Sequence, residues 1–151
     1  MSGSRKTLLV VVLAVIVIGL VVSSAYFLYG RGAQSGTGGL PPYCTKPTGG
    51  YLIVASAKGY NDSVDHGVPA NSWPVINVQR GSTVTITVCD TDAQAHGFQV
   101  THYLDNKIET VSPGQAITVT FVADQTGRFK IYCSIFCTVH WAMQSGLLVV
   151  S

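Results

Sequence analysis

Short runs of β-branched and aromatic residues, separated by turn-forming residues, make up the chain from residue 43 onward. The alternation is clearest between Thr83 and Val88, where Val84, Ile86 and Val88 share one face of an extended strand and the threonines share the other. The same region contains no amphipathic helical stretch of useful length. The pattern therefore predicts an all-β domain, a β-sandwich of about seven or eight strands over 51–57, 74–78, 82–88, 96–100, 115–121, 127–133 and 146–150.

Two groups of turn-forming residues separate the later runs. Ser112-Pro113-Gly114 precedes the run 115–121, and Asp124-Gln125-Thr126-Gly127 follows it. Both groups are typical of hairpin turns. We therefore expect each of them to join two neighbouring antiparallel strands.

A continuous apolar pattern occupies the N-terminal part of the chain. From Leu8 to Leu28 there are 21 residues without a charge, close to the ~20 residues that a helix needs to cross the hydrocarbon core of a bilayer. Arg5 and Lys6 precede this run, which indicates a cytoplasmic N-terminus. The pattern predicts a cytoplasmic tail over 1–7 and a single transmembrane anchor over 8–29.

A cleaved signal peptide is the alternative interpretation of the same apolar run. Ser23-Ser24-Ala25 offers small residues for cleavage, but the run is longer than the roughly 7–15 apolar residues of such a peptide. The Gly-rich residues 30–42 then form a flexible linker. Either interpretation places the domain over 43–151 outside the cytoplasm, and the anchor would hold it at the cell membrane as part of a single-pass protein.

Composition and charge add one exclusion to this picture. The chain is 47% hydrophobic and only 11% charged, against about 25% charged residues in a typical soluble domain. Much of the difference comes from the apolar run. From residue 40 onward six Lys and Arg face seven acidic residues, a net charge of −1. This balance gives no reason to expect nucleic acid as a partner.

The candidate chemistry lies in the segment CSIFCTVHWAM, which contains Cys133, Cys137, His140 and Met143. Thiolate, imidazole and thioether together form a soft ligand set that selects copper over hard cations. Zinc would accept the Cys and His ligands but has little use for a thioether. His96 begins another predicted strand, and sheet pairing can bring it to this loop and complete a His₂Cys site with a weak axial Met.

Each of these residues alone has a simpler explanation. Cys133 and Cys137 could form a disulfide, Met143 could fill the core and His96 could be a hydrogen-bonded histidine at the rim. Strand parity, however, places Cys133 on the core-facing side of the run 127–133, as a buried metal site requires. The combination of all four in one β-rich domain therefore predicts a metal site.

At these residues the sequence resembles the cupredoxins, and in particular the CuA domain of subunit II of haem-copper oxidases and of nitrous oxide reductase. The likeness is most evident from Phe121 to Val150 and extends over the whole domain. It rests on the motif Cys-x3-Cys followed by His and Met and on an HGF motif upstream, whose counterparts here are CSIFC (133–137), His140, Met143 and His96-Gly97-Phe98.

The resemblance implies a Greek-key β-sandwich of the cupredoxin type and two copper ions bridged by Cys133 and Cys137. It also implies that Ile135 lends its backbone carbonyl to copper. The chain departs from the CuA pattern at one place, because only Thr138 and Val139 stand where that pattern has three residues. The spacing Cys-x2-His-x2-Met resembles that of mononuclear blue-copper proteins such as amicyanin, which bind one copper ion. Both interpretations stay open, and the CuA-like one is preferred.

Either centre indicates an electron carrier, because no coordination position is left open for a substrate. The resemblance implies a CuA-like subunit II of a haem-copper terminal oxidase, a part of a cytochrome c oxidase-type oxidoreductase. It would take electrons from cytochrome c or another cupredoxin and pass them to a haem-containing membrane subunit. An independent mononuclear cupredoxin shuttle is the alternative. Trp141 is a candidate contact for the redox partner, or a lid over the metal.

Two other classes of protein account less well for this pattern. A copper chaperone of the Sco type also carries Cys-x3-Cys and a distant His, but it has a thioredoxin-like fold with its cysteines early in the domain. In this chain the cysteines lie near the end, in β-type sequence. A purely structural extracellular β-sandwich would leave the ligand cluster unexplained.

The remaining cysteines and histidines carry weaker signals. Cys44 begins the domain, and Cys89 shares the threonine face of its strand, which points away from the core. In an oxidising compartment the two could form a disulfide that pins the N-terminal arm to the sheet. A disulfide and two separate thiols both stay open. His66 and His102 are expected to be ordinary surface histidines.

Overall fold

The structure, a computed structural model, describes residues 39–151, and this part of the chain folds into two β-sheets and two short 3-10 helices. The first sheet has the order β2 (Gly59–Tyr60), β1 (Tyr51–Ser56), β4 (Thr83–Asp90) and β7 (Ala116–Val122). The second has the order β3 (Val75–Val78), β9 (Gly146–Val150), β8 (Gly127–Tyr132), β5 (His96–Val100) and β6 (Glu109–Val111). The helices are η1 (Ser63–His66) and η2 (His140–Met143).

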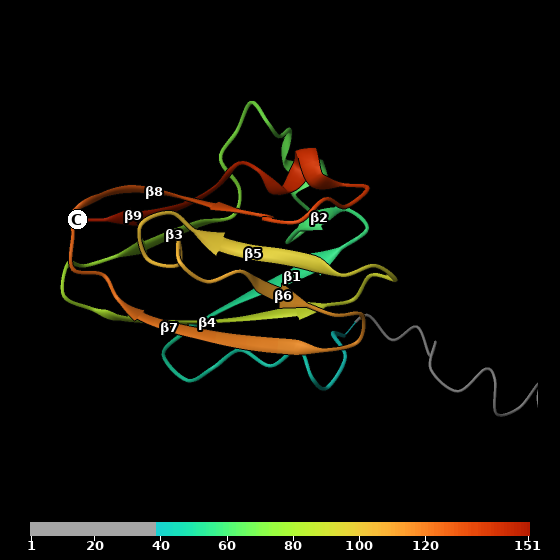
Figure 1. Cartoon of the computed structure of the whole chain (residues 1–151), viewed down its shortest axis with the longest axis horizontal. Helices are drawn as coiled ribbons and strands as arrows, with labels where there is room; N and C mark the ends of the chain where they lie inside the picture. Colours follow the sequence, from blue (N-terminus) through green and yellow to red (C-terminus); the bar gives the residue numbers. More distant parts are fainter. Residues whose placement is uncertain (1–38) are drawn as a thin grey trace, which may run out of the picture. The chain divides into compact units, whose positions relative to one another are not determined.

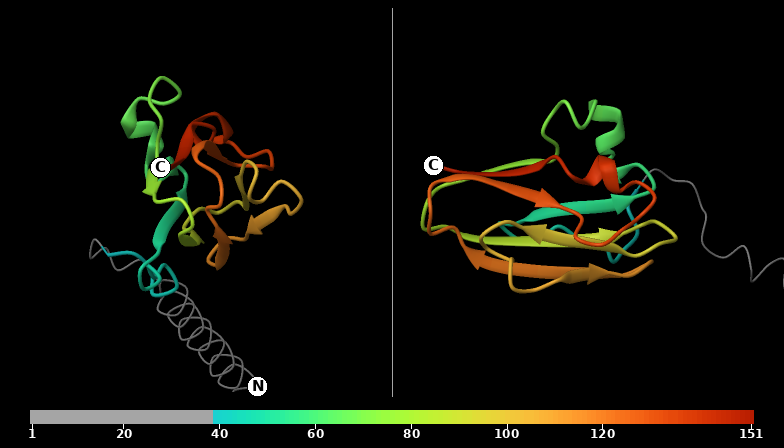
Figure 2. Two further views of the ribbon diagram at one scale, coloured as in Figure 1. Left: turned by 90° about the vertical axis from the view of Figure 1, so that its left-hand side faces the viewer. Right: turned by 45° about the horizontal axis from the view of Figure 1, so that its top comes forward.

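The two sheets face each other as the layers of a sandwich (Figure 1, Figure 2). Each layer is mixed, since β1 runs parallel to β4 and β3 runs parallel to β9, whereas the other pairs are antiparallel. All seven predicted strands are present, and β2 and β6 are additional strands of two and three residues. The prediction of an all-β sandwich is confirmed, and the Sco-type alternative, which requires a thioredoxin-like fold, is wrong.

The core between the layers follows the predicted alternation. Val84, Ile86 and Val88 on β4 are buried, and so are Phe129 and Ile131 on β8. Arg128 and Lys130, which alternate with them on β8, are exposed. Burial of apolar side chains from both sheets provides the main driving force for closing the sandwich.

The two predicted hairpin turns are wrong, because each joins strands of different sheets. Ser112-Pro113-Gly114 connects β6 to β7, and Asp124–Gly127 leads from β7 to β8. The first is a tight turn, in which the N–H of Gln115 donates to the carbonyl of Ser112 over 3.0 Å. A turn sequence records where the chain reverses, but the next strand joins whichever layer buries its apolar face.

The strand directions bring the candidate ligands to one end of the sandwich. β5 is antiparallel to β8, and β8 is antiparallel to β9. The start of β5, where His96 lies, is therefore next to the end of β8, which Cys133 follows. η2 precedes β9 at this same end, and the C-terminus lies at the opposite end (Figure 1).

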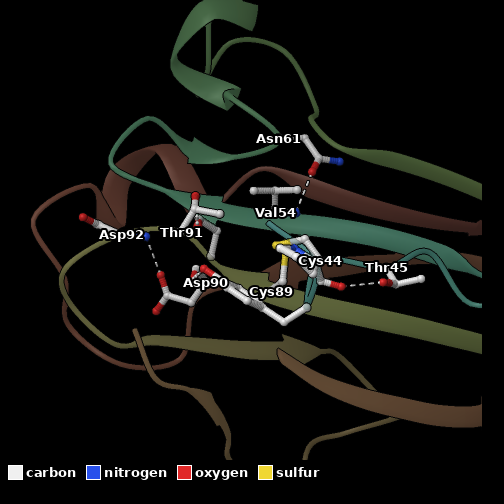
Figure 3. Close-up of a disulfide and its surroundings, with 11 residues drawn as sticks. Cys44, Thr45, Val54, Asn61, Cys89, Asp90, Thr91 and Asp92 are labelled. Carbon is white, nitrogen blue, oxygen red and sulfur yellow. Dashed lines mark hydrogen bonds between the residues drawn. A yellow bond between two sulfur atoms is a disulfide. The ribbon is translucent and has the colours of Figure 1, made fainter. Parts of the chain in front are cut away.

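A disulfide joins Cys44 to Cys89 across the outer face of the first sheet (Figure 3), with Cα atoms 5.3 Å apart. Cys89 is on the threonine side of β4, as parity predicts, yet it is fully buried because the arm that carries Cys44 covers it. The Tyr43 hydroxyl donates to the carbonyl of Asp90 over 3.1 Å and holds the same arm. The structure thus decides a pairing that the sequence leaves open.

The predicted tail over 1–7, the anchor over 8–29 and most of the linker over 30–42 lie outside the described residues. Within residues 39–151, no helix has the length and apolar character needed to cross a membrane. The described domain forms one compact unit from Leu40 to Ser151.

Candidate metal centre

Three buried side chains meet at the end of the sandwich. The ligand atoms of His96, Cys133 and Cys137 all lie within 4.8 Å of one another. The two sulfur atoms are 3.8 Å apart and both cysteines are free, so they do not form the disulfide considered above. This distance is short enough for one metal ion to contact both sulfurs, since metal–sulfur bonds are about 2.3 Å long.

Met143 and Ile135 bring two further donor atoms to the same place. The Sδ atom of Met143 lies 4.0 Å from the Sγ atom of Cys137, and its side chain is fully buried. The carbonyl oxygen of Ile135 lies 3.0 Å from the Sγ atom of Cys133. A thioether and a carbonyl oxygen are the weak axial donors known from copper electron-transfer sites.

His140 reaches the cluster from its outer side. It begins η2, is half-buried, and its Nδ1 atom is 3.0 Å from the Ile135 carbonyl oxygen. All six residues predicted as ligands therefore lie in one place. The tightest part is the group of His96, Cys133 and Cys137. His140 is not part of this group and contacts it through the Ile135 carbonyl.

His96 is held by one ring nitrogen and free at the other. Its Nε2 atom is 3.0 Å from the Oδ2 atom of Asp92, whereas its Nδ1 atom is buried and has no hydrogen-bond partner. An unsatisfied buried nitrogen is costly. Histidines that bind metals commonly present one nitrogen to the ion and bond the other to a carboxylate. The unpartnered Nδ1 atom therefore fits a metal ligand.

The two thiols differ in acidity. Burial raises the pKa of Cys133, but the neighbouring His96 ring and the backbone of Ile135 and Gly97 outweigh this effect and lower the pKa to about 7. Burial and the negative charge of Cys133 raise the pKa of Cys137 to about 12. Without a cation Cys137 therefore stays protonated at neutral pH while Cys133 is partly ionised, and a bound cation would displace the remaining protons.

The protonation of His96 depends on the same neighbours. Burial lowers its pKa, but Cys133 and the carboxylates of Asp90 and Asp92 outweigh this effect and leave the pKa raised. The cluster therefore favours positive charge, because the readily ionised Cys133 thiol and the carboxylates of Asp90 and Asp92 lie near the His96 ring.

Close packing of the backbone supports the ligands. The N–H of Gly97 points at the Sγ atom of Cys133 over 3.3 Å. A Cβ atom on Gly97 would lie only 2.5 Å from the Oγ atom of Ser134 and 2.7 Å from its backbone nitrogen, so any larger residue would push β5 away from the cysteine loop. The side chain of Gln144 donates to the Cys133 carbonyl over 2.9 Å.

Sequence reasoning missed some of these contributors. Asp92 and Gln144 gave no signal by their spacing, because they act through His96 and the Cys133 backbone across the fold. Phe136 is a residue whose signal was available, since it is an aromatic between two ligands. It is 91% exposed, and its ring centroid lies 6.1 Å from that of His140. Trp141, the predicted contact, is 51% exposed.

The other two histidines belong to the surface and not to the cluster. His66 is exposed and stacks on Trp73 with ring centroids 3.7 Å apart. His102 is exposed and lies 3.5 Å from a carboxylate oxygen of Asp124.

Comparison with known proteins relates this site to copper enzymes. The chain matches no protein-family model. It is 30% identical over 112 residues to a nitrous-oxide reductase from Ralstonia nicotianae, which covers 72% of this chain and 17% of that enzyme. It is 35% identical over 85 residues to the nitrous-oxide reductase of Cupriavidus necator, which covers 54% of this chain and 13% of the enzyme. The chain thus spans less than a fifth of the length of these relatives.

Solved structures place the fold. A chain of a haem-copper terminal oxidase dimer superimposes with a TM-score of 0.52 at 17% identity, with 100% of both chains covered. An auracyanin from Roseiflexus castenholzii superimposes with a TM-score of 0.50 at 17% identity, over 71% of this chain and 99% of that protein. The domain is cupredoxin-like, and it resembles the CuA region of nitrous-oxide reductases.

A cupredoxin-like domain with this donor set is suited to copper and to electron transfer. Two thiols, imidazole nitrogen and a thioether select a soft metal ion. Four of the candidate donors, His96, Cys133, Cys137 and Met143, are buried in the packed end of the sandwich, which suits a copper ion held in one geometry while its charge changes.

Proposed function

We propose that this chain is the CuA-like subunit II of a haem-copper terminal oxidase and that its domain carries electrons through a binuclear copper centre. The observation that supports this proposal most directly is the pair of buried thiols, Cys133 and Cys137, 3.8 Å apart and beside the unpartnered nitrogen of His96. A mononuclear site needs one thiolate, whereas two thiolates at this distance suit two ions that share them.

Each residue of the cluster then has a role. Cys133 and Cys137 would hold copper as thiolates, and His96 through Nδ1 and His140 would supply the imidazoles. Met143 and the Ile135 carbonyl would act as weak axial donors. Bound copper would supply reversible one-electron chemistry. The residues themselves would keep the donor atoms in place, because His96 lies on β5, His140 and Met143 lie on η2, and hydrogen bonds hold the loop that carries the two cysteines.

The ligand set leaves no position for a substrate, so the domain would exchange electrons and not catalyse a reaction of its own. The partners would be cytochrome c or another cupredoxin as donor and a haem-containing membrane subunit as acceptor. With a net charge of −1 from residue 40 onward, long-range steering would be weak. Trp141 and Phe136, exposed beside His140, would provide a local apolar contact.

The membrane location rests on the sequence. The apolar run from Leu8 to Leu28 would anchor the chain in the cell membrane with the domain on the extracytoplasmic side. The Cys44–Cys89 disulfide supports this side, because disulfides persist in oxidising compartments. An anchor would keep the electron carrier beside an integral-membrane acceptor.

A mononuclear cupredoxin shuttle is the second candidate, and the spacing of the candidate ligands favours it. Only two residues separate Cys137 from His140, as in mononuclear blue-copper proteins. A single ion would then be bound by His96, Cys137 and His140, with Met143 as a weak donor. Cys133 would then be a neighbour and not a ligand.

Copper counting with electron paramagnetic resonance on the copper-loaded full chain tests the proposal. Two copper ions per chain, with hyperfine coupling to two equivalent nuclei, are expected. Coupling to a single nucleus would exclude the binuclear centre. The variant Cys133→Ala sharpens the test, because a mononuclear site on Cys137 would survive it and a binuclear site would not. Co-purification with a haem-containing membrane subunit tests the role as subunit II.

A further inference from the structure

The polar segment Asn61–Trp73, between β2 and β3, packs against residues 133–143, which contain four of the candidate ligands and are called the ligand loop below. It contains η1, which lies beside η2 at the metal end of the sandwich (Figure 1, Figure 2). Ser63 in this segment is fully buried, and its hydroxyl donates to the carbonyl of Ala142 over 2.7 Å. Ala142 directly precedes Met143, which would be a weak donor to copper.

A second hydrogen bond from the same segment falls on the other side of Met143. The backbone N–H of Trp73 donates to the carbonyl of Ser145 over 3.0 Å. The carbonyl of Met143 itself accepts from the N–H of Cys133 over 2.9 Å. Three hydrogen bonds therefore hold the backbone around Met143. Two of them come from the segment Asn61–Trp73, about 70–80 residues away in sequence.

The contact between Ser63 and the ligand loop depends on close packing. Gly59 lies under it with φ +92, and a Cβ atom there would be 2.1 Å from the Ser63 hydroxyl oxygen and 3.2 Å from the Ala142 Cβ atom. Only glycine combines this φ with so little space. The Ser63 hydroxyl can thus reach the Ala142 carbonyl because Gly59 has no side chain to fill the space between them.

The segment is also braced at its base. The indole N–H of Trp73 donates to the Asn61 carbonyl over 2.8 Å, and the Asn61 side-chain oxygen accepts from the N–H of Val54 on β1 over 2.8 Å. The ring of His66 stacks on Trp73. Because these contacts hold the segment in place, its hydrogen bonds to Ala142 and Ser145 can fix the position of the ligand loop.

We infer that Ser63 is a positioning residue that sets the distance between the Met143 thioether and the metal. This inference rests on the proposed copper centre. The Sδ atom of Met143 is a weak donor, so the protein and not the bond determines how closely it approaches. Withdrawing a donor destabilises the more positive oxidised ion more than the reduced ion. Loss of the Ser63 hydroxyl would release the Ala142 carbonyl and let the Met143 thioether move away from the metal, so it should raise the reduction potential.

The test compares variants of the copper-loaded full chain. Ser63→Ala should have a higher midpoint potential than the wild type and an altered copper absorption and paramagnetic resonance spectrum. The matched control is Asp65→Asn. Asp65 lies in the same segment as Ser63 and forms an exposed salt bridge, with its Oδ2 atom 3.1 Å from the Nζ atom of Lys58, away from the ligand loop. The control should keep the wild-type potential and spectrum.

A second variant covers the case in which Ser63→Ala does not fold. Trp73→Phe removes the brace to the Asn61 carbonyl but keeps an aromatic ring for His66, and it should shift the potential in the same direction by less. Wild-type potentials and spectra in the folded variants, even with lower thermal stability, would overturn the inference and leave Ser63 a structural residue. A wild-type chain that takes up no copper would instead overturn the proposed function, and the inference with it.

Discussion

Gln94 holds Thr138 by two hydrogen bonds, one from each end of its side-chain amide. Its Nε2 atom donates to the Thr138 hydroxyl, and its Oε1 atom accepts from the Thr138 backbone N–H over 3.0 Å. Thr138 belongs to the two-residue spacer that distinguishes this ligand loop. The same amide donates to Asp92 over 2.9 Å, and Asp92 contacts His96. One hydrogen-bonded chain therefore joins the loop before His96 to the short loop after Cys137.

Removing the carboxylate of Asp92 from this hydrogen-bond network should weaken copper binding. In Asp92→Ala, His96 loses the partner that orients its ring, and copper affinity should fall about 10–100-fold. Gln94→Ala should have a smaller effect in the same direction, because Gln94 acts through Asp92 and Thr138. Competition with a copper chelator measures both. Asp124→Ala, which removes an exposed carboxylate near His102, is the control, and an equal loss there would contradict a specific role for Asp92.

Copper affinity should fall as the pH is lowered from about 8 to about 5, because protons and metal compete for the same ligand atoms. The pKa of His96 is raised, so proton competition begins at a higher pH than for an ordinary histidine. The raised pKa of Cys137 means that its proton must be displaced by the metal. Chelator competition at a series of pH values measures the effect, together with proton release on copper addition. An affinity that does not change over this range would contradict the ligand assignment.

The Cys44–Cys89 disulfide should stabilise the domain without affecting the copper site. It closes a loop with a sequence separation of 45, and removing such a link typically costs about 2–4 kcal/mol of the free energy of unfolding. Denaturant titration of the variant Cys44→Ala/Cys89→Ala should show this loss. The copper spectrum should stay that of the wild type, since neither residue touches the ligand cluster. A changed spectrum would show that the arm carrying Cys44 helps to shape the site.

Replacing Trp141, the exposed aromatic residue beside the proposed ligand His140, should slow electron exchange. Trp141→Ala should lower the second-order rate with cytochrome c several-fold, because a local apolar contact would be lost. The potential and copper spectrum should not change, since Trp141 is half exposed and is not a ligand. Stopped-flow kinetics measure the rate. Ile108→Ala, which alters a residue 70% exposed just before β6, serves as the control and should react like the wild type.

Much of the site could be predicted from local sequence. Cys133, Cys137, His140 and Met143 lie within eleven residues, so their donor chemistry and spacing indicate a soft metal site before any fold is considered. His96 needed only one further step, the pairing of its strand with the end of β8. The burial of Cys133 followed from the two-residue period of a strand.

Other features depend on contacts between distant segments. The turns at Ser112–Gly114 and Asp124–Gly127 were placed correctly but assigned to the wrong topology, because layer membership depends on which faces become buried. The pairing of Cys44 with Cys89 depends on how the N-terminal arm crosses the sheet. Asp92 and Ser63, which hydrogen-bond to His96 and to the Ala142 carbonyl, belong to no sequence motif.

The amino-acid sequence by itself determined the alternating strands, the apolar N-terminal run and the identities of the candidate copper ligands, since these depend on residue chemistry over short spans. The tertiary structure decided which turns cross between sheets, that Cys44 bonds Cys89, and how Asp92, Gln94 and Ser63 support the ligand loops. The physical reason is the range of the interactions. Periodicity and spacing are local properties, whereas a hydrogen bond between Ser63 and Ala142 exists only after the whole sandwich has folded.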